Sequence, residues 1–334
     1  MVEAQSLIFN IESNGKSFTL TYHLKDKTTE ILDDTKDKAT ILKCGTYPEI
    51  LLHKLVPGSK FSVEGQEYKV LDHSNEFTKK FFGERKRTYG MIKPDSCKNI
   101  GKIIDMTSQD GFHFNNMKMF KWTKEQAQNF YEEHKGKSFF EGLTDFMSSG
   151  PIVGMELSAE CAIEKWRALI GPTNSHNARK DAPNSVRARF GTDGQRNAVH
   201  GSDAPATAER EIKLVFESKY PTTATFKNCA CVLVKPKSIN DGRLGKIIDA
   251  ILTKGFEVTA LEMKKISKER AEKFLNEKKE EVDKVMEGEA VVMEVAKENI
   301  TKELPEVLEV FKDDVYFSGT PEDGMKDCQL FFGA

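Results

Sequence analysis

Residues 1–84 alternate apolar and polar side chains in short runs. The segment from Phe18 to Leu24 shows this alternation most clearly, and it is typical of a half-buried β-strand. Turn-forming pairs such as Asn14-Gly15 and Pro57-Gly58 separate the runs. The pattern predicts a mostly β domain over residues 1–86, with strands over 6–12, 18–24, 28–33, 39–43, 60–63 and 67–72.

The rest of the chain contains an internal repeat. The segment Gly101–Asp105, with the sequence GKIID, recurs unchanged at Gly245–Asp249, and Gly111-Phe112 recurs as Gly255-Phe256 at the same spacing. Two further matches occur in the same order, of 91–94 with 233–236 and of 153–156 with 291–294. Four ordered matches predict a duplicated domain, with copies over 87–222 and 228–334.

Each copy alternates predicted strands and helices. A capping-box pattern at Thr123–Gln126 predicts a helix that continues to about His134, and Ser267 is the corresponding cap in the second copy. Strands are expected over 88–93, 112–120 and 151–157, and again over 230–235, 256–263 and 290–295. Further helices are expected over 98–110, 160–169 and 242–254. This order predicts an α/β sandwich, and the basic residues 85–87 are expected to form a solvated linker before it.

Composition restricts the class of function. The formal net charge is −2, which gives no general attraction to nucleic acid or to anionic membranes. The sequence has no apolar run of about 18 residues and no secretory signal at its start. Its six cysteines lack a metal-ligand spacing, and Cys229-Ala230-Cys231 is expected to be part of an apolar strand. The chain is therefore expected to be intracellular, with reduced thiols.

One histidine in the first copy is surrounded in sequence by residues suited to phosphoryl transfer. A nucleophilic imidazole needs one free nitrogen and an acceptor on the other, and Glu211, eleven residues after His200, can be that acceptor. Cationic and polar donors for phosphate are available at Lys93, Arg167, Thr173, Arg187 and Asn197. For each residue alone, a structural role such as a turn or a surface charge is more common. The residues by themselves therefore indicate only an α/β protein that could handle phosphate.

The residues from Thr88 to Tyr220 resemble the nucleoside diphosphate kinase family. The resemblance rests on Ile92-Lys93-Pro94-Asp95, on Tyr131 and on the segment Phe139–Leu143. It continues in family order through Ser149-Gly150-Pro151, Arg167, Gly171–Asn174, Arg187, Arg196-Asn197, His200-Gly201-Ser202-Asp203 and Glu211. It implies the family's ferredoxin-like α/β fold, present here in two copies.

The resemblance also implies roles for the residues. His200 would take the γ-phosphoryl group of a nucleoside triphosphate such as ATP and return it to a nucleoside diphosphate, with Glu211 and Ser202 supporting the imidazole. Lys93, Tyr131, Arg167, Thr173, Arg187 and Asn197 would hold phosphates and ribose, and Phe139 and Leu143 would flank the base. Mg²⁺ on the phosphates is implied, with Asp203 a ligand only through water. The segment from Thr173 to Arg187 is longer than in short members of the family.

The second copy lacks much of this set. Tyr316 stands at the histidine position and Leu275 at the position of Tyr131, and the segment between Met293 and Tyr316 is too short to contain counterparts of Thr173 and Arg187. A phenol with a pKa near 10 is a weak nucleophile at neutral pH. The second copy is therefore expected to be inactive and to pair with the first as a pseudo-dimer.

A β-rich module before two kinase copies resembles a narrower, member-seven-like subgroup of the family. That likeness rests on residues 58–60, 70–72, 179–182 and 190–194. It implies a DM-ten domain with a pleckstrin-homology-like fold, location in the cytoplasm, the cytoskeleton and the axoneme of cilia, and tubulin and other microtubule-lumen proteins as partners. Three hypotheses remain from the sequence: a kinase located at microtubules, a purely structural microtubule inner protein with a relic site, and a protein-histidine phosphotransfer module.

Overall fold

A computed structural model describes residues 6–82, 85–275 and 279–333 and separates into two compact units. One unit comprises Met1–Arg87 together with Ser158–Ala162, and the other comprises Thr88–Leu157 and Ile163–Ala334. Within the described ranges, every helix is too short or too polar to cross a membrane.

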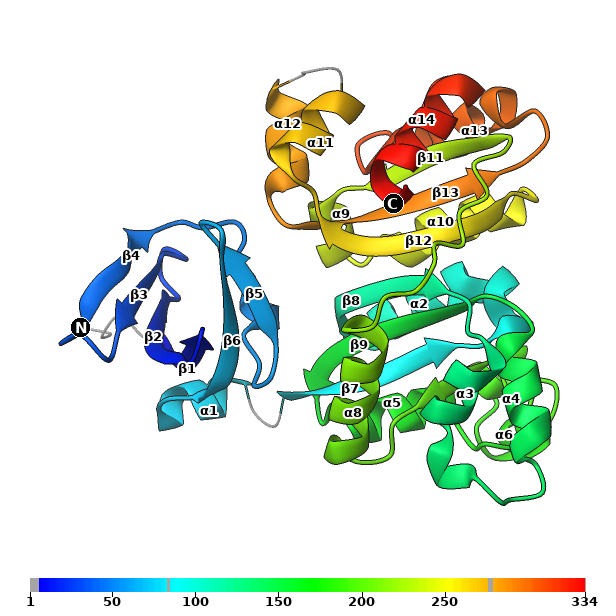
Figure 1. Ribbon diagram of the computed structural model, residues 1–334, viewed down its shortest axis with the longest axis horizontal. Helices are drawn as coiled ribbons and strands as arrows, with labels where there is room; N and C mark the ends of the chain where they lie inside the picture. The colour runs from blue at the N-terminus through cyan, green and yellow to red at the C-terminus, as the bar shows by residue number, and fades with distance from the viewer. Residues whose placement is uncertain (1–5, 83–84, 276–278, 334) are drawn as a thin grey trace. The chain divides into compact units, whose positions relative to one another are not determined.

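The first unit is built on a six-stranded antiparallel sheet (Figure 1). All six expected strands are confirmed, and their order in the sheet is β4-β3-β2-β1-β6-β5. Their bounds are β1 (Ser6–Ser13), β2 (Lys16–His23), β3 (Thr29–Asp33), β4 (Ala39–Gly45), β5 (Lys60–Val63) and β6 (Gln66–His73). Alternate side chains of β1, among them Phe9 and Ile11, are fully buried, as the period of two requires. The helix α1 (Glu76–Phe82) and the 3-10 helix η1 (Leu52–Lys54) were not predicted.

The second unit contains one continuous eight-stranded sheet. Its first half extends to residue 220 and contains β7 (Arg85–Ile92), β8 (His113–Phe120), β9 (Ile152–Glu160) and β10 (Val199–Gly201), of which residues 85–87 and 158–160 are grouped with the first unit. Its second half, residues 229–333, contains β11 (Cys229–Val234), β12 (Glu257–Lys265), β13 (Glu289–Ala296) and β14 (Val315–Phe317). The strand order in the sheet is β10-β7-β9-β8-β12-β13-β11-β14. From the junction outward, the order is β8-β9-β7-β10 in the first half and β12-β13-β11-β14 in the second, so corresponding strands occupy corresponding places.

Helices cover the sheet of the second unit (Figure 1). In β9, eight of the nine residues are buried, which requires cover on both faces. The first half contains η2 (Pro94–Asn99), α2 (Ile100–Gln109), α3 (Lys124–Phe130), η3 (Glu132–His134), α4 (Phe140–Ser148), α5 (Ala162–Ile170), α6 (Ser175–Asp181), α7 (Val186–Phe190) and α8 (Pro205–Phe216). The second contains α9 (Pro236–Asn240), α10 (Leu244–Thr253), α11 (Lys268–Phe274), α12 (Lys279–Met286), α13 (Ile300–Leu308), η4 (Glu309–Phe311) and α14 (Pro321–Phe332).

Two local expectations need correction. The basic segment at 85–87 is not a linker, because it forms the start of strand β7. The helix predicted from Thr123 to about His134 ends at Phe130, and a separate 3-10 helix follows over Glu132–His134. Its start is as expected, since Thr123 and Gln126 form a reciprocal capping box. Ser267 also caps its helix, accepting a hydrogen bond from the amide of Arg270.

The two halves meet at β8 and β12 and at the glycines of the repeated GKIID segments. Strands β8 and β12 pair antiparallel at Lys118 and Glu262. A Cβ placed on Gly101 would overlap the backbone nitrogen of Asp249 and would lie 2.6 Å from its Cα. A Cβ on Gly245 would meet Asp105 in the same way, with its Cα again 2.6 Å away. Helices α2 and α10 therefore approach each other as closely as backbones allow, and only glycine fits at either position.

Candidate functional site

His200 lies in the short strand β10, where its backbone pairs with Met91 of β7. Its Nε2 is 2.9 Å from Oε1 of Glu211, which α8 presents from the interior with only 1% of its surface exposed. The other oxygen of Glu211 accepts a hydrogen bond of 2.6 Å from the hydroxyl of Ser202. A carboxylate can only accept, so the hydrogen of this bond is on Nε2, and the tautomer that the contact favours leaves Nδ1 without one.

The remaining nitrogen of His200, Nδ1, is left with its lone pair available. The side chain is 20% exposed, so the ring is reachable without being fully solvated. The rings of Phe130 and Tyr131 meet it edge-on, with centroids 5.4 and 6.0 Å away. A neutral imidazole with one held and one free nitrogen is the arrangement that a nucleophilic histidine needs.

The backbone around His200 is held from several directions. Ala198 has a φ of +67°, which is unusual for a residue with a Cβ. The side chain of Asp95 supports this conformation by accepting a hydrogen bond of 3.1 Å from the Ala198 amide. The indole of Trp166 donates to the carbonyl of His200 at 3.1 Å. A Cβ on Gly201 would lie 2.6 Å from that indole nitrogen, so a glycine is required after the histidine.

Lys93 brings a buried cation to the same site. Its ammonium donates to Oδ1 of Asn197 at 2.7 Å and to the carbonyl of Gln195 at 3.4 Å, and the residue is 5% exposed. Burial, and then the charge of Arg187, lowers the pKa of Lys93 to about 7, against smaller opposing effects of Asp95 and Asp193. No carboxylate of the described residues forms an ion pair with Lys93, so the site is prepared for an anion that arrives from outside.

Arg187 is the second buried cation. It donates to the carbonyls of Gly171 at 2.9 Å and Val199 at 3.1 Å, while its buried Nε has no partner. Burial, and then the charge of Arg167, lowers the pKa of Arg187 to about 10. The hydroxyl of Tyr131 is also buried without a partner. Two such orphaned donors beside a histidine are explained by a ligand that accepts hydrogen bonds.

The other expected site residues differ in how deeply they are buried. Asn197 is buried and bridges Lys93 to the carbonyl of Thr173, 2.9 Å from its Nδ2. Phe139 is 48% exposed at the start of α4, whereas Leu143 is buried in the core of the first half. Exposed side chains are found at Arg167, Thr173 and Asp203.

The long segment after Thr173 is ordered by its own caps. It forms α6 and α7, which begin at side-chain caps from Asn174 and Ser185. Arg179 ties the two helices together by donating to the carbonyl of Gly191 at 2.9 Å. The extra residues therefore build a helical pair that carries Arg187 into the site.

Three contributors were not identified as such from the sequence. Asp95 and Trp166 hold the backbone around His200, and the carbonyl of Gln195 accepts a hydrogen bond from the Lys93 ammonium. None of the three has a sequence spacing that would identify it as a site residue. In the sequence, Asp95 stands out only as part of the family motif Ile92-Lys93-Pro94-Asp95. Gln195 also donates to the carbonyl of Gly142 in α4 at 2.8 Å, a contact between segments 53 residues apart that periodicity cannot reveal.

The second half keeps part of this arrangement around Tyr316. The hydroxyl of Ser318 donates to Asp327 at 2.8 Å, just as Ser202 donates to Glu211. The tyrosine hydroxyl itself is buried without a partner, and the ammonium of Lys235 lies 4.1 Å from the centre of its ring. The positions are retained, but the imidazole and the buried arginine are not.

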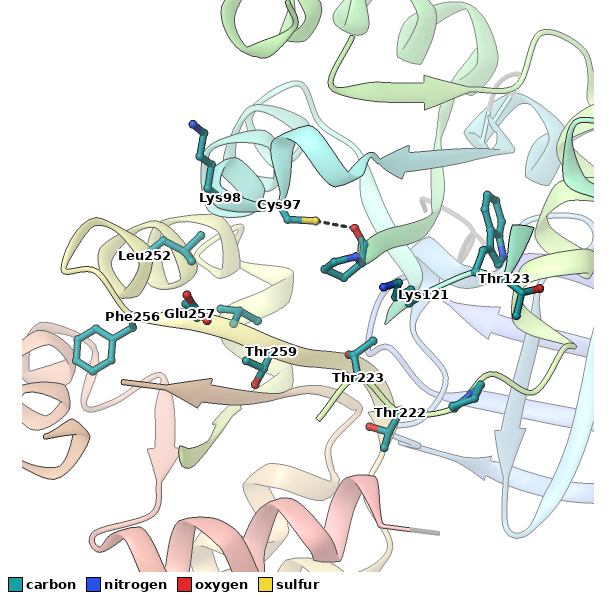
Figure 2. A pocket seen from close by; sticks show the side chains of 14 residues that line it. Cys97, Lys98, Lys121, Thr123, Thr222, Thr223, Leu252, Phe256, Glu257 and Thr259 are labelled. Carbon is teal, nitrogen blue, oxygen red and sulfur yellow. Dashed lines mark hydrogen bonds between the residues drawn. The ribbon is translucent and has the colours of Figure 1, made fainter. Parts of the chain in front are cut away.

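A cavity of about 770 Å³ lies elsewhere in the second unit (Figure 2). Its lining includes the segment 221–223, the start of β12 and the residues 121–123 that follow β8. The thiol of Cys97 donates to the carbonyl of Pro151 across one wall, at 3.0 Å, and Thr259 contributes to another (Figure 2). None of its lining residues belongs to the set around His200, so the cavity is not the site of the expected chemistry.

Comparison with known proteins gives one consistent result. A family model described as nucleoside diphosphate kinase matches residues 86–220 and 228–311. Nucleoside diphosphate kinase homolog 7 of Rattus norvegicus is 33% identical over 95% of this chain and 89% of its own length. The nucleoside diphosphate kinase of Aquifex aeolicus is 48% identical over 39% of this chain and 93% of its own length. A crystal structure of the Aquifex enzyme covers 40% of this chain and 95% of its own, with a TM-score of 0.39.

Proposed function

The chain belongs to the nucleoside diphosphate kinase family, and we propose that its first half transfers the γ-phosphoryl group of a nucleoside triphosphate to a nucleoside diphosphate through phospho-His200. The observation that carries this proposal is the hydrogen-bonded set of His200, Glu211 and Ser202 beside the buried cations Lys93 and Arg187. The 48% identity to a bacterial kinase over this half supports it.

The proposed reaction has two steps. In the first, the Nδ1 lone pair of His200 attacks the γ-phosphorus, the Nδ1–P bond forms, and the bond to the β,γ-bridging oxygen breaks. The nucleoside diphosphate leaves with that electron pair. In the second step, a terminal oxygen of another nucleoside diphosphate attacks the phosphorus, and the histidine nitrogen recovers its lone pair. Glu211 keeps the proton on Nε2 throughout, so the same nitrogen is presented in both steps.

The remaining site residues bind and orient. Lys93 and Arg187 neutralise phosphate oxygens, and Arg167 and Thr173 extend the contact from more exposed positions. Phe139 offers an exposed ring to the base, a contact that tolerates any base because each has a π-face. Mg²⁺, when bound to the phosphates, would reduce their charge. The exposed carboxylate of Asp203 is suited to contact Mg²⁺ through a water molecule rather than to coordinate it directly.

The test of the proposal is a labelling experiment on the full chain. Incubation with γ-labelled ATP and Mg²⁺ is expected to place acid-labile label on the protein, and added GDP is expected to remove it as labelled GTP. A folded protein that takes up no label would favour the scaffold hypothesis. Label that GDP cannot remove would favour a protein-histidine phosphotransfer module.

Replacement of Glu211 by glutamine is expected to lower phosphoryl transfer by about 10²-fold or more. Glutamine keeps the shape, but its amide cannot accept from both His200 and Ser202, so the imidazole is no longer held with Nε2 protonated. The loss should fall on the rate of His200 labelling rather than on nucleotide affinity, measured by rapid quench and by equilibrium binding. Asp327→Asn is the matched control in the second half, and an equal loss there would contradict the assignment.

Nucleotide binding is expected to take up a proton above neutral pH. The pKa of Lys93 is about 7 in the free protein, so at about pH 8.5 its amine is largely neutral, and bound phosphate raises the pKa again. Calorimetry of ADP binding in buffers of different ionisation enthalpy should show this uptake at about pH 8.5 and little of it at about pH 6. Lys93→Arg, charged at both pH values, should show none.

The same shift has a consequence for the stability of the free protein. The amine binds a proton more weakly in the folded state, at about 7, than at the usual 10.5. The contribution of Lys93 to the free energy of unfolding therefore rises as pH increases from about 7 toward 10.5. In the calorimetric experiment on ADP binding, an enthalpy at about pH 8.5 that does not depend on the buffer would contradict a pKa of about 7 for Lys93.

A structural role is the second candidate, favoured by the second half. That half keeps its strands and continues the sheet of the first, yet it has Tyr316 at the histidine position. We infer that the halves are two kinase modules joined as a pseudo-dimer, with the second inactive. The pleckstrin-homology-like nature of the N-terminal sheet, the axonemal location and the tubulin partner remain predictions from the subgroup resemblance.

A further inference from the structure

Three thiols and one carboxylate meet in the interior of the second half. Cys229 and Cys231 are two positions apart on β11, so their side chains share a face of the sheet. Cys328 comes from α14, almost a hundred residues later, and Glu294 from β13. The sulfurs of Cys229 and Cys328 and a carboxylate oxygen of Glu294 all lie within 4.8 Å of one another. None of the four residues is more than 1% exposed.

A close approach of α14 to β11 produces the cluster. A Cβ on Gly324 would overlap the carbonyl oxygen of Cys229 and would lie 2.9 Å from its carbonyl carbon. The absence of a side chain at Gly324 lets the helix rest directly on the strand. Cys328 is four residues further on, about one helical turn, and therefore faces the same strand. Its thiol also neighbours that of Cys231.

Glu294 is an unusual neighbour for thiols in an apolar core. Its Oε1 accepts hydrogen bonds from the Thr259 hydroxyl at 2.7 Å and from the Thr225 amide, and its Oε2 accepts one from the Phe226 amide at 3.0 Å. No cationic side chain in the described part of the chain forms an ion pair with it. A fully buried carboxylate normally has a cation, either a side chain or a metal. Its amide and hydroxyl contacts resemble those that orient metal-ligating carboxylates.

We propose that Cys229, Glu294 and Cys328 bind one thiophilic divalent cation, Zn²⁺. Two sulfurs and one carboxylate oxygen are donors that zinc accepts in tetrahedral sites, where a water molecule can be the fourth ligand. Burial raises the pKa of the Cys229 thiol, so this thiol is neutral without an ion. Each thiol that coordinates therefore releases one proton to solvent when the ion enters.

The thiols of the cluster are not required by the fold that the halves share, whereas Glu294 has a buried counterpart in Glu156 of the first half. In the repeat, Tyr89 stands at the position of Cys231, and Ile212 at that of Cys328, so the first half has an aromatic ring and an aliphatic side chain there. The second half also has a shorter segment between β13 and β14. An ion joining β11, β13 and α14 would stabilise this reduced half, because metal binding adds directly to folding free energy.

The test measures zinc on the full, reduced chain. Protein equilibrated with Zn²⁺ and desalted is expected to carry one ion per chain by elemental analysis, and Co²⁺ is expected to give a thiolate-to-cobalt absorption band. Cys229→Ser and Cys328→Ser should each lose at least about nine-tenths of the bound ion. Cys44→Ser, which changes an exposed thiol of the first unit, is the matched control and should keep it.

A second variant separates binding from folding. Thr259→Val removes one of the two hydroxyls that donate to Oε1 of Glu294, the one at 2.7 Å, and is expected to weaken zinc binding by about tenfold or more. Zinc should also raise the Tm of the wild-type chain, and a chelator should reverse the rise. The proposal is overturned if the folded, reduced wild type retains no ion, if the Cys229→Ser and Cys328→Ser variants retain it, or if Thr259→Val binds zinc like the wild type. None of these readouts depends on kinase activity.

Discussion

Replacement of His200 by alanine is expected to abolish the acid-labile label and to lower phosphoryl transfer by about 10⁴-fold or more. The loss is large because, among the described residues near Lys93 and Arg187, no other side chain has one ring nitrogen hydrogen-bonded to a carboxylate and a second nitrogen free to attack. The measurement is the uptake of label from γ-labelled ATP and its transfer to GDP. Nucleotide binding should change far less than transfer, since the phosphate-binding cations are untouched.

Tyr316→Phe is the control for that experiment. It removes a hydroxyl from the matching position of the second half and leaves the set around His200 in place. Full labelling of this variant is expected if the second half is inactive. Label that persists in His200→Ala would reject the proposed nucleophile, and label lost in Tyr316→Phe would assign chemistry to the second half.

Replacement of Gly101 by alanine is expected to destabilise the second unit by about 2 kcal/mol. Glycine to alanine in a helix ordinarily stabilises by about 1 kcal/mol, so propensity alone predicts the opposite sign. Here the new Cβ would overlap backbone atoms of Asp249, which cannot move aside by rotating a side chain. Helices α2 and α10 must separate, which costs packing along the whole junction. Urea unfolding should show the loss as a lower midpoint.

Gly319→Ala is the matched control, because a Cβ there meets no atom within 4 Å. Its unfolding midpoint should stay close to that of the wild type. Gly245→Ala should reproduce the loss seen at Gly101, since it makes the same contact with Asp105. The double variant should lose less stability than the two single variants added together, because the helices need to separate only once. An unchanged midpoint in Gly101→Ala would mean that the two halves do not pack as described.

Much of the fold was predictable because it depends on local patterns. The six strands of the first unit follow from alternation between turn-forming pairs, and the capping box at Thr123 from four neighbouring residues. Helix ends were predicted less well. The helix after Thr123 stops at Phe130, where its continuation becomes a 3-10 helix. Strand β7 includes basic residues whose charge suggested a linker.

The sequence by itself determined the order of elements, the repeat and the identity of the chemical groups. It identified His200, Glu211 and Lys93 as candidate site residues, because residue type and family order are properties of a linear chain. Only the tertiary structure decided which nitrogen of His200 is free and which donors are buried without partners, since both depend on contacts between distant segments. The cysteines illustrate the same limit. Their spacing predicted no metal site, yet the packing of α14 on β11 brings Cys328 to Cys229 and Glu294.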